Sequence, residues 1–359
     1  MKHIMNIQKF NVKAAAAVAA AVAGLCGCSD WTRPEALDVA PEMQESSEET
    51  LAAIRAFKQT DHKIVVLGME ATPDAPVARY QHVTSMPDSA DYIYIRDLVG
   101  GLNGAIAPEI AEVRSKKGTK VLADVDYMSI QEAWQDMQDD KIDAGEPQGT
   151  EDEFAAYCKE QTEAQLACCS TYGCDGIMVS YNGSATFDWH RTGRAAFLNA
   201  VADWYGQNSS KEMIVRGTLN LIAQNTVAGS DDPLYDWESF LGNCRYIIYA
   251  IGENTIDGDV NLGINRILRS YSSFPADKFI VEATVPDPSD PGTQIGMTPA
   301  RAAEYVLVEN EDFSKLGLCV ENAEDDYFNI GNSYINVRRA ITVLNTEPSV
   351  DENPSATEE

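Results

Sequence analysis

The amino-acid sequence predicts a single (β/α)8 TIM barrel, an α/β fold. Three observations support this prediction: the chain has 359 residues, eight short apolar runs recur along it, and helix-like patterns fill the gaps. The runs are hydrophobic throughout rather than at alternate positions, which is typical of strands buried on both faces. Their spacing of about 28 to 55 residues leaves room for a crossover helix each time.

Each apolar run is a predicted strand, and turn-forming or charged residues flank it. The alternative fold, an open doubly wound sheet, would favour a GxGxxG sequence after an early strand, and none stands there. We therefore expect the strands to close into a barrel. The predicted strands cover residues 63–68, 91–95, 120–125, 176–180, 213–217, 245–250, 278–283 and 316–320.

Helix signals occupy the gaps between the runs. Thr150 followed by Glu153 indicates a capping box, and Thr298-Pro299 offers an N-cap followed by proline at the first helical position. Two lysines followed by a glycine, at 116–118, are typical of a helix end. Strands and helices therefore alternate along the chain. An amphipathic stripe at helical spacing is formed by Phe197, Leu198, Val201, Trp204 and Tyr205.

The first 27 residues have the composition of a lipoprotein signal peptide. Three lysines precede an apolar run at 14–24 that is about half the length needed to span a bilayer. The next four residues, Leu25-Cys26-Gly27-Cys28, resemble a bacterial lipobox. We expect Cys28 to carry lipid as the mature N-terminus. The protein is therefore predicted to be anchored by this lipid in the cell envelope, in the outer membrane. Exposure at the cell surface is left open.

The remaining chain divides by composition into three parts. Residues 28–60 are polar and acidic and are predicted to form a tether that ends in a short helix at 50–57, residues 61–346 form the barrel, and 347–359 form a disordered acidic tail. Between the third and fourth strands, 127–172 is expected to be an enlarged loop plus a helix at the barrel mouth. The stretches 139–141 and 145–147 within it lack a core pattern.

Charge and residue usage exclude several classes of function. Acids outnumber bases 56 to 27, which gives a formal net charge of -29, so nucleic acid is excluded as a main partner. The four histidines lie far apart and form no HxxxH pair, so we expect neither a metal site nor a cofactor. Six cysteines remain after Cys28, and we interpret them as small buried hydrophobic residues, although the sequence does not decide whether any two pair.

Polar residues follow the predicted strands at their C-terminal ends, where barrels of this kind hold their sites. Carboxylate and amide groups accept hydrogen bonds from hydroxyls, so this lining predicts a carbohydrate site. Trp189, Tyr127 and Tyr181 are candidates for stacking on sugar rings. The strand-end residues are Glu70, Asp97, Asp124, Asp126, Asn182, Asn220, Glu253, Glu282 and Glu321.

The fourth strand resembles a known motif. Residues 172–182, Tyr-Gly-Cys-Asp-Gly-Ile-Met-Val-Ser-Tyr-Asn, are similar to the DGxDxDxE strand of glycoside hydrolase family 18, the chitinases and endo-β-N-acetylglucosaminidases. The resemblance implies that the last position protonates the glycosidic oxygen and that the position two before it orients the substrate's 2-acetamido group. Here the three acidic positions hold Met178, Ser180 and Asn182, none of which is a carboxylic acid. Strand alternation predicts that all three point into the barrel.

The closing segment is similar to lipoprotein members of the same family from Bacteroides-type bacteria. In those proteins a strand, an acidic Asp-Tyr turn and a helix end the barrel, which would correspond here to 326–334 and 337–341. The resemblance covers about 61–345, essentially the whole predicted barrel.

Three hypotheses on function follow from this sequence. The first is a lipid-anchored protein that binds N-acetylglucosamine-containing glycans, such as N-glycan cores, without cleaving them, as part of an outer-membrane glycan-uptake system. The second is an active glycosidase of family 18 type whose acid has moved to Glu253, Glu282 or Glu321, and the third is a scaffold without a sugar ligand. The predicted ligand-binding residues are Glu70, Asp126, Asn182, Trp189, Asn220, Glu253, Glu282 and Glu321.

Overall fold

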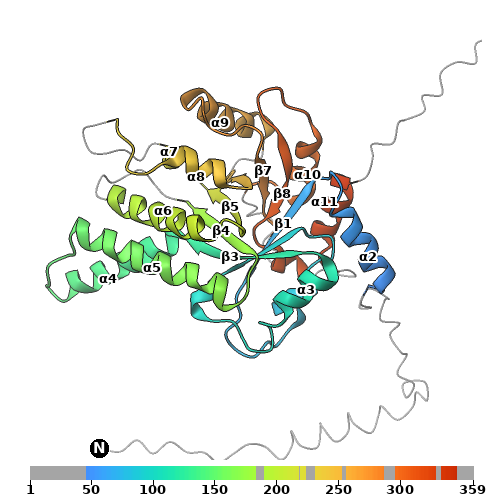
Figure 1. Ribbon diagram of the computed structural model, residues 1–359, viewed down its shortest axis with the longest axis horizontal. Helices are drawn as coiled ribbons and strands as arrows, with labels where there is room; N and C mark the ends of the chain where they lie inside the picture. Colours follow the sequence, from blue (N-terminus) through green and yellow to red (C-terminus); the bar gives the residue numbers. More distant parts are fainter. Residues whose placement is uncertain are drawn as a thin grey trace, which may run out of the picture. The chain divides into compact units, whose positions relative to one another are not determined.

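The structure, a computed structural model, describes residues 46–182, 190–217, 219–223, 231–252, 256–286, 296–328 and 333–345. Within these residues the eight strands are parallel and form a closed barrel in chain order (Figure 1). The predicted (β/α)8 TIM barrel is therefore confirmed. The predicted signal peptide, Cys28, most of the tether and the acidic tail lie outside the described residues.

Each predicted strand is present, and its ends lie within two residues of the expected ones. The agreement reflects how directly a continuous apolar run reports a strand that is covered on both faces. The strands are β1 Ile64–Glu70, β2 Tyr92–Arg96, β3 Lys120–Asp126, β4 Gly176–Tyr181, β5 Glu212–Gly217, β6 Tyr246–Tyr249, β7 Phe279–Ala283 and β8 Lys315–Val320.

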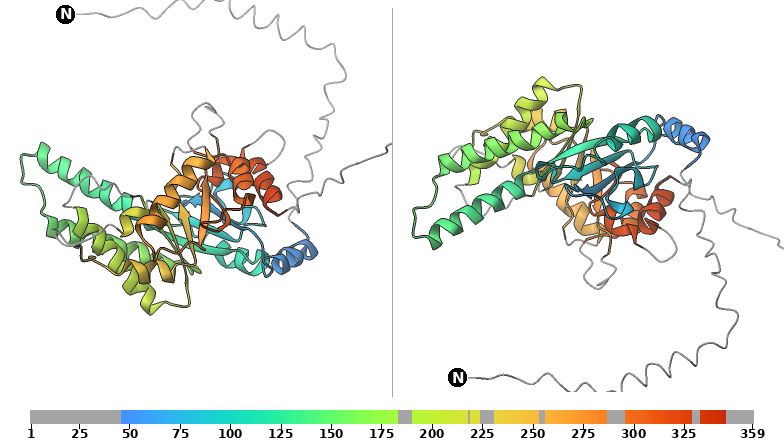
Figure 2. Two further views of the ribbon diagram at one scale, coloured as in Figure 1. Left: turned by 90° about the horizontal axis from the view of Figure 1, so that it is seen from above. Right: turned by 90° about the horizontal axis from the view of Figure 1, so that it is seen from below.

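Helices pack around the barrel, and the expected helix signals are confirmed where they were placed (Figures 1 and 2). Thr150 and Glu153 form a reciprocal capping box, and the side chain of Thr298 accepts from the amide of Arg301. Gly118 ends a helix in the left-handed conformation. The helices are α2 Glu48–Phe57, α3 Glu109–Lys117, α4 Tyr127–Asp143, α5 Glu151–Thr171, α6 His190–Gln207, α7 Leu219–Ala223, α8 Trp237–Asn243, α9 Asp257–Ser270, α10 Pro299–Leu307 and α11 Ile335–Asn345.

The segment between β3 and β4 differs from the expectation of a loop plus a helix. It forms two long helices, α4 and α5, that run side by side (Figures 1 and 2), and residues 139–141 belong to α4. The sequence pattern did not indicate α4 because only one narrow face of this helix is covered by other side chains, and most of its residues are therefore polar. The buried side chains of α4 are Tyr127, Ile130, Trp134 and Gln138.

The barrel has two hydrophobic layers, and strand alternation assigns each residue to one of them. The outer layer lies between the strands and the helices, and it holds the apolar stripe of α6. The inner layer fills the barrel itself, so the fold encloses a packed core rather than a channel. Its members include Val66, Tyr94, Leu122, Met178, Ile214, Ile248, Ile280 and Cys319.

The helix expected at the end of the tether is confirmed as α2, and it is attached to the barrel through Lys58. The ammonium group of Lys58 donates to the carbonyls of Asp88, Ala90 and Lys117 and to the hydroxyl of Thr119. Burial lowers the pKa of Lys58 to about 8. Because β2 follows Ala90 and β3 follows Thr119, this lysine fixes α2 at the N-terminal ends of the strands.

The closing segment has the expected order of strand, turn and helix. After β8 comes the 3-10 helix η6, Ala323–Tyr327, and the buried carboxylate of Asp326 accepts from the amide of Val337 in α11 at 2.8 Å. Asp326 therefore ties the turn after β8 to the start of the last helix.

Six cysteines are buried as free thiols, which agrees with their interpretation as small hydrophobic residues. Across the described ranges no helix is both long enough and apolar enough to cross a bilayer. In the same ranges no three histidine, cysteine or acidic side chains gather in an arrangement that could hold a metal ion.

Candidate functional site

A group of polar side chains lies inside the barrel at the C-terminal ends of the strands, which we call the mouth. Strand alternation places these residues on the same face as the inner core, two or four positions beyond its last apolar members. A barrel of this type holds its site at this end. The inward-facing residues are Glu70, Arg96, Asp124, Asp126, Ser180, Asn182, Arg216, Glu282 and Glu321.

The fourth strand contributes three residues to the mouth, as predicted. Met178 is fully buried in the inner core, and Ser180 lies above it with its hydroxyl donating to the carboxyl of Asp124 at 2.6 Å. Asn182 directly follows the strand and is half-buried beside Gly217. The end of β4 therefore presents a hydroxyl and an amide to the mouth.

The opening residues of the same motif have a structural role. Asp175 accepts from the guanidinium of Arg114 at 2.6 Å and from the amide of Val121 at 2.9 Å, so it joins β4 to β3 and α3. A Cβ on Gly176 would lie 2.0 Å from the carbonyl oxygen of Glu212, so β5 can approach only a glycine here. The chain thus keeps the residues that build the strand and lacks the carboxylates at its far end.

Two acids on β3 face the mouth, and their roles differ. Asp126 caps α4 by accepting from the amides of Met128 and Ser129 at 2.9 and 3.1 Å. Desolvation, together with the nearby charge of Asp126, raises the pKa of Asp124 to about 7. Asp124 therefore exchanges its proton near neutral pH, next to the position where the family motif has an acid.

A buried ion-pair group crosses the mouth on the opposite side. Arg216 on β5 pairs with Glu282 on β7 at 2.5 Å and with Glu321, after β8, at 2.7 Å. Burial raises the pKa of Glu282, and the charge of Arg216 opposes that rise. Two of the three candidate relocated acids, Glu282 and Glu321, are therefore held by one guanidinium group.

A second arginine holds the acids near β1 and β8. Arg96 on β2 donates to the carbonyl of Glu321 at 3.1 Å and pairs with the carboxylate of Glu324. Burial raises the pKa of Glu324 to about 7, and among the described residues its Oε2 has no hydrogen-bond partner. Glu324 is thus a second carboxyl group that exchanges its proton near neutral pH.

Three aromatic side chains form a cluster at the rim of the mouth, on the loops that follow β1 and β8. The ring centre of Phe328 lies 5.3 Å from that of Tyr80 and 5.1 Å from that of Tyr327, both edge to face. Phe328 is 63% exposed, so one ring of the cluster is available to a ligand. We call Tyr80, Tyr327 and Phe328 the rim aromatic cluster.

The expected stacking role of Tyr127 and Tyr181 is wrong. Both side chains are fully buried against Phe197 of α6, on the outer face of the barrel wall. Tyr181 alternates with Ser180 and Asn182 and must therefore point away from the mouth. A sugar cannot reach either ring.

The other predicted residues have mixed outcomes. Glu70 and Asp97 are exposed at the ends of β1 and β2. Trp189 and Glu253 lie outside the described residues, and Asn220 is placed only as part of the backbone of α7. Sequence reasoning missed Arg96, Arg216, Glu324 and the rim aromatic cluster. A search for inward-facing positions on every strand would have found the two arginines.

Comparison with known proteins places the chain in a family. Residues 30–343 match the family described as glycoside hydrolase family 18, BT1044-like. The chain belongs to this family. Among curated proteins no significant relative is found.

Three solved structures share the fold of this chain. A selenomethionine form of BT1044 with one glutamate changed to glutamine is 14% identical over 85% of this chain and 95% of its own, with a TM-score of 0.54. An endo-β-N-acetylglucosaminidase from Cordyceps militaris is 17% identical over 86% and 99%, with a TM-score of 0.54. A variant of the Cordyceps enzyme, with an Asp-to-Asn and a Glu-to-Gln change two positions apart, was solved with fucosyl-N-acetylglucosamine-Asn (16% identity, TM-score 0.54, coverage 86% and 99%).

Proposed function

We propose that this family 18 protein binds N-acetylglucosamine-containing glycans without hydrolysing them. The observation that carries the proposal is the end of β4, where Ser180 and Asn182 face the mouth at the positions that the family motif fills with acids. General acid catalysis contributes about 10²–10⁴-fold, and an amide cannot donate a proton in this way. Without a carboxylate at Ser180, the acetamido group of a substrate also lacks its orienting partner.

The loss of these acids does not prevent binding. Sugar hydroxyls and acetamido groups need hydrogen-bond partners, which Asn182, Glu70 and the Asp124–Ser180 pair can supply. The exposed ring of Phe328 offers an apolar surface for a sugar face. The Cordyceps variant supports this separation of binding from chemistry, because it was solved with its ligand although an aspartate and a glutamate had been changed to amides.

The test compares titration with turnover on one chitobiose-containing glycan, using residues 29–359 of the chain. We expect calorimetric binding and no product by mass spectrometry. The variant Ser180→Asp/Asn182→Glu restores two carboxylates, and we expect it to gain hydrolysis. The matched control Ser180→Asn/Asn182→Gln restores polar bulk without acid and should stay inactive. Turnover by the unsubstituted chain, or no binding to any aminosugar glycan on an array, would contradict the proposal.

The alternative, an active glycosidase with a relocated acid, is favoured by one specific observation. The pKa values of Asp124 and Glu324 are raised to about 7, which suits a general acid, and neither residue was among the relocated acids predicted from the sequence. If the chain hydrolyses the glycan, activity should vanish in Asp124→Asn or Glu324→Gln. Glu253→Gln, Glu282→Gln and Glu321→Gln test the three acids predicted earlier.

We also propose that lipid on Cys28 anchors the protein in the cell envelope, in the outer membrane, where it serves a glycan-uptake system. The lipobox-like residues 25–28 and the short apolar run before them support this proposal. Metabolic labelling with a fatty acid should mark the protein, and Cys28→Ala should abolish the label. Retention of the label in Cys28→Ala would contradict the anchor. Co-purification from detergent-solubilised outer membranes tests for uptake partners.

A further inference from the structure

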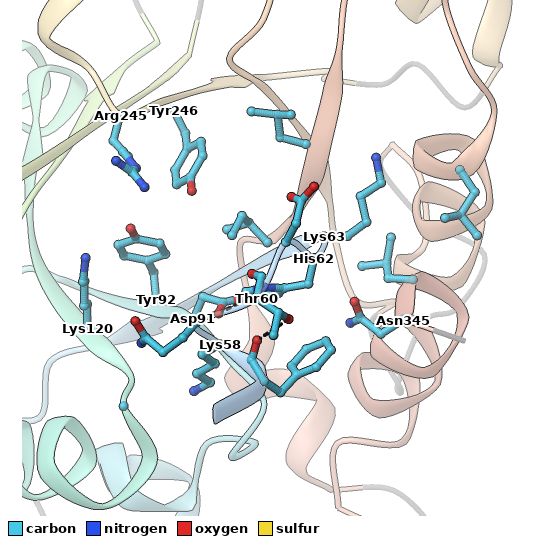
Figure 3. A pocket seen from close by; sticks show the side chains of 18 residues that line it. Lys58, Thr60, His62, Lys63, Asp91, Tyr92, Lys120, Arg245, Tyr246 and Asn345 are labelled. Carbon is cyan, nitrogen blue, oxygen red and sulfur yellow. Dashed lines mark hydrogen bonds and ion pairs between the residues drawn. The ribbon is translucent and has the colours of Figure 1, made fainter. Parts of the chain in front are cut away.

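A second hollow lies at the opposite end of the barrel from the mouth. This cavity of about 890 Å³ is formed around the N-terminal ends of the strands (Figure 3). Its volume is in the range of pockets that bind drug-sized ligands. Its floor consists of Ile64, Tyr92, Tyr246 and Leu316, and the rings of the two tyrosines meet edge to face at 6.0 Å. We call this cavity the basal hollow.

Basic side chains predominate around the basal hollow, although the whole chain carries a net charge of -29. Four lysine or arginine residues line it against two aspartates. One of those aspartates, Asp91, is occupied, because it accepts from His62 and from the amide of Val65, each at 2.9 Å. Figure 3 shows Lys120 and Arg245 reaching into the same space as the hydroxyls of Tyr92 and Tyr246. The basic lining residues are Lys58, Lys63, Lys120 and Arg245.

The four cations differ in how many of their donors the described structure uses. Lys58 is committed to four acceptors, and Lys120 is paired with Glu212. Lys63 donates to one carbonyl, that of Lys315 at 2.8 Å, and an ammonium group has three donors. Arg245 is exposed, lies 5.6 Å from the ring centre of Tyr246 and hydrogen-bonds the side chain of that tyrosine, and a guanidinium group has five N–H donors. Lys63 and Arg245 are therefore the cations best able to receive further carboxylates.

The last described residue of the chain lies at the rim of this hollow. Asn345, the last residue of α11, lines the cavity. The next fourteen residues, 346–359, contain five acids and no lysine or arginine. An extended chain covers about 3.3–3.6 Å per residue, so the acids nearest Asn345 can reach the hollow easily. The five acids of the segment are Glu347, Asp351, Glu352, Glu358 and Glu359, of which Glu347 is nearest to Asn345.

We propose that the acidic segment 346–359 binds in the basal hollow and sets its carboxylates against Lys63 and Arg245. Because the segment is attached at Asn345, its binding would be intramolecular. A short linkage gives the segment an effective concentration of about millimolar at the hollow, so weak contacts suffice to hold it there. A segment without a core of its own can still bind in an extended form. The contact is electrostatic and partly exposed, so salt should weaken it. This proposal is independent of what binds at the mouth.

The test uses the chain truncated after Asn345 and a fluorescently labelled peptide with the sequence of 346–359. In low salt, fluorescence anisotropy should show the peptide binding to the truncated chain and at least tenfold more weakly to the full chain, whose own segment competes. The signal should fall when salt is raised. Hydrogen exchange of residues 59–63 and 244–246 should be slower in the full chain than in the truncated one. Equal peptide binding to both chains, or none to the truncated chain, would overturn the proposal.

Matched variants separate this contact from general charge attraction. Lys63→Gln/Arg245→Gln in the truncated chain should weaken peptide binding at least fivefold, whereas Lys141→Gln/Lys159→Gln, on the α4–α5 pair, should not. A peptide with every acid changed to its amide should fail to bind. Equal binding of the amide peptide would refute the ionic contact. If inorganic phosphate or anionic vesicles bind the truncated chain and the acidic peptide does not, the hollow has another occupant and the proposal fails.

Discussion

The two ends of this barrel are built from the same strands, but they hold their arginines in different ways. At the mouth, Arg216 is buried between Glu282 and Glu321, so each charge has a fixed partner inside the protein. At the basal hollow, Arg245 is exposed above an aromatic floor. Burial forces a charge to find a partner within the fold, because an unpaired buried ion is very costly. An exposed charge needs no such partner within the fold and can instead bind an oppositely charged group from outside it.

The largest effect that tests this comparison is the loss of Arg216. The variant Arg216→Met leaves the buried carboxylate of Glu282 without its cation, which should lower the free energy of unfolding by about 3–5 kcal/mol. Urea denaturation followed by circular dichroism measures the change. The control Arg339→Met replaces an exposed arginine of α11 and should alter stability little. A loss below about 1 kcal/mol for Arg216→Met would show that the mouth tolerates an unpaired acid, and the comparison would then fail.

The second effect concerns pH, because the mouth holds acids with raised pKa values. The pKa of Asp124 is raised to about 7, above its value near 4 in the unfolded chain, so folding is most favourable when Asp124 is protonated. Stability should therefore fall as pH rises from about 4 through 7, by at most ~1.4 kcal/mol per pH unit from this group.

Unfolding free energies of Asp124→Asn at pH 5, 6 and 7 test that dependence. The amide oxygen can still accept from Ser180, so the variant should keep its fold and lose part of the pH slope. The control Asp97→Asn changes an exposed carboxylate outside the mouth and should keep the slope of the unsubstituted chain. An unchanged slope in Asp124→Asn would show that Asp124 does not titrate in this range.

A smaller effect is expected from the rim aromatic cluster, and it depends on glycan binding at the mouth. Phe328→Ala should weaken glycan binding by about 0.5–1.5 kcal/mol, or about two- to twelvefold in Kd, because a sugar face loses its aromatic partner. Calorimetry measures the change. The control Leu262→Ala removes an exposed side chain of α9. Equal glycan affinities for Phe328→Ala and the control would show that the glycan does not contact this rim.

The smallest effect should come from the basal hollow. Arg245→Gln removes an exposed cation and should change the free energy of unfolding by no more than about 0.5 kcal/mol. The same denaturation assay used for Arg216→Met measures it, so the two arginines are compared directly. A loss of several kcal/mol in Arg245→Gln would mean that the hollow depends on its cations for folding, and the contrast between the two ends would disappear.

The family motif on β4 illustrates how far sequence reasoning reached. Asp175 and Gly176 are retained, and the structure gives each a role in building the strand: an ion pair with Arg114 and a close approach to Glu212. The residues that differ, Ser180 and Asn182, face the mouth. Matching the motif therefore predicted the fold well, because the retained part is structural. The same match could not reveal that Asp124, on the neighbouring strand, brings a carboxyl to Ser180.

Errors in the predicted site have a common physical origin. Tyr127 and Tyr181 lie next to polar strand ends in the sequence, but strand alternation turns Tyr181 toward the helices. Phe328 and Tyr80 are 248 positions apart and meet only because the loops after β1 and β8 are neighbours in the closed barrel. The long α4 was missed because its exposed face resembles a loop in composition.

The sequence by itself determined the strands, their order and most helix ends of this protein. Those features depend on local rules, namely apolar runs of strand length, capping residues and the room that a crossover helix needs. Only the tertiary structure decided which acids are paired, which acids have a raised pKa and which aromatic rings are exposed. Such properties depend on burial and on partners from distant strands, as Arg216 and its two glutamates do, and no local pattern encodes them.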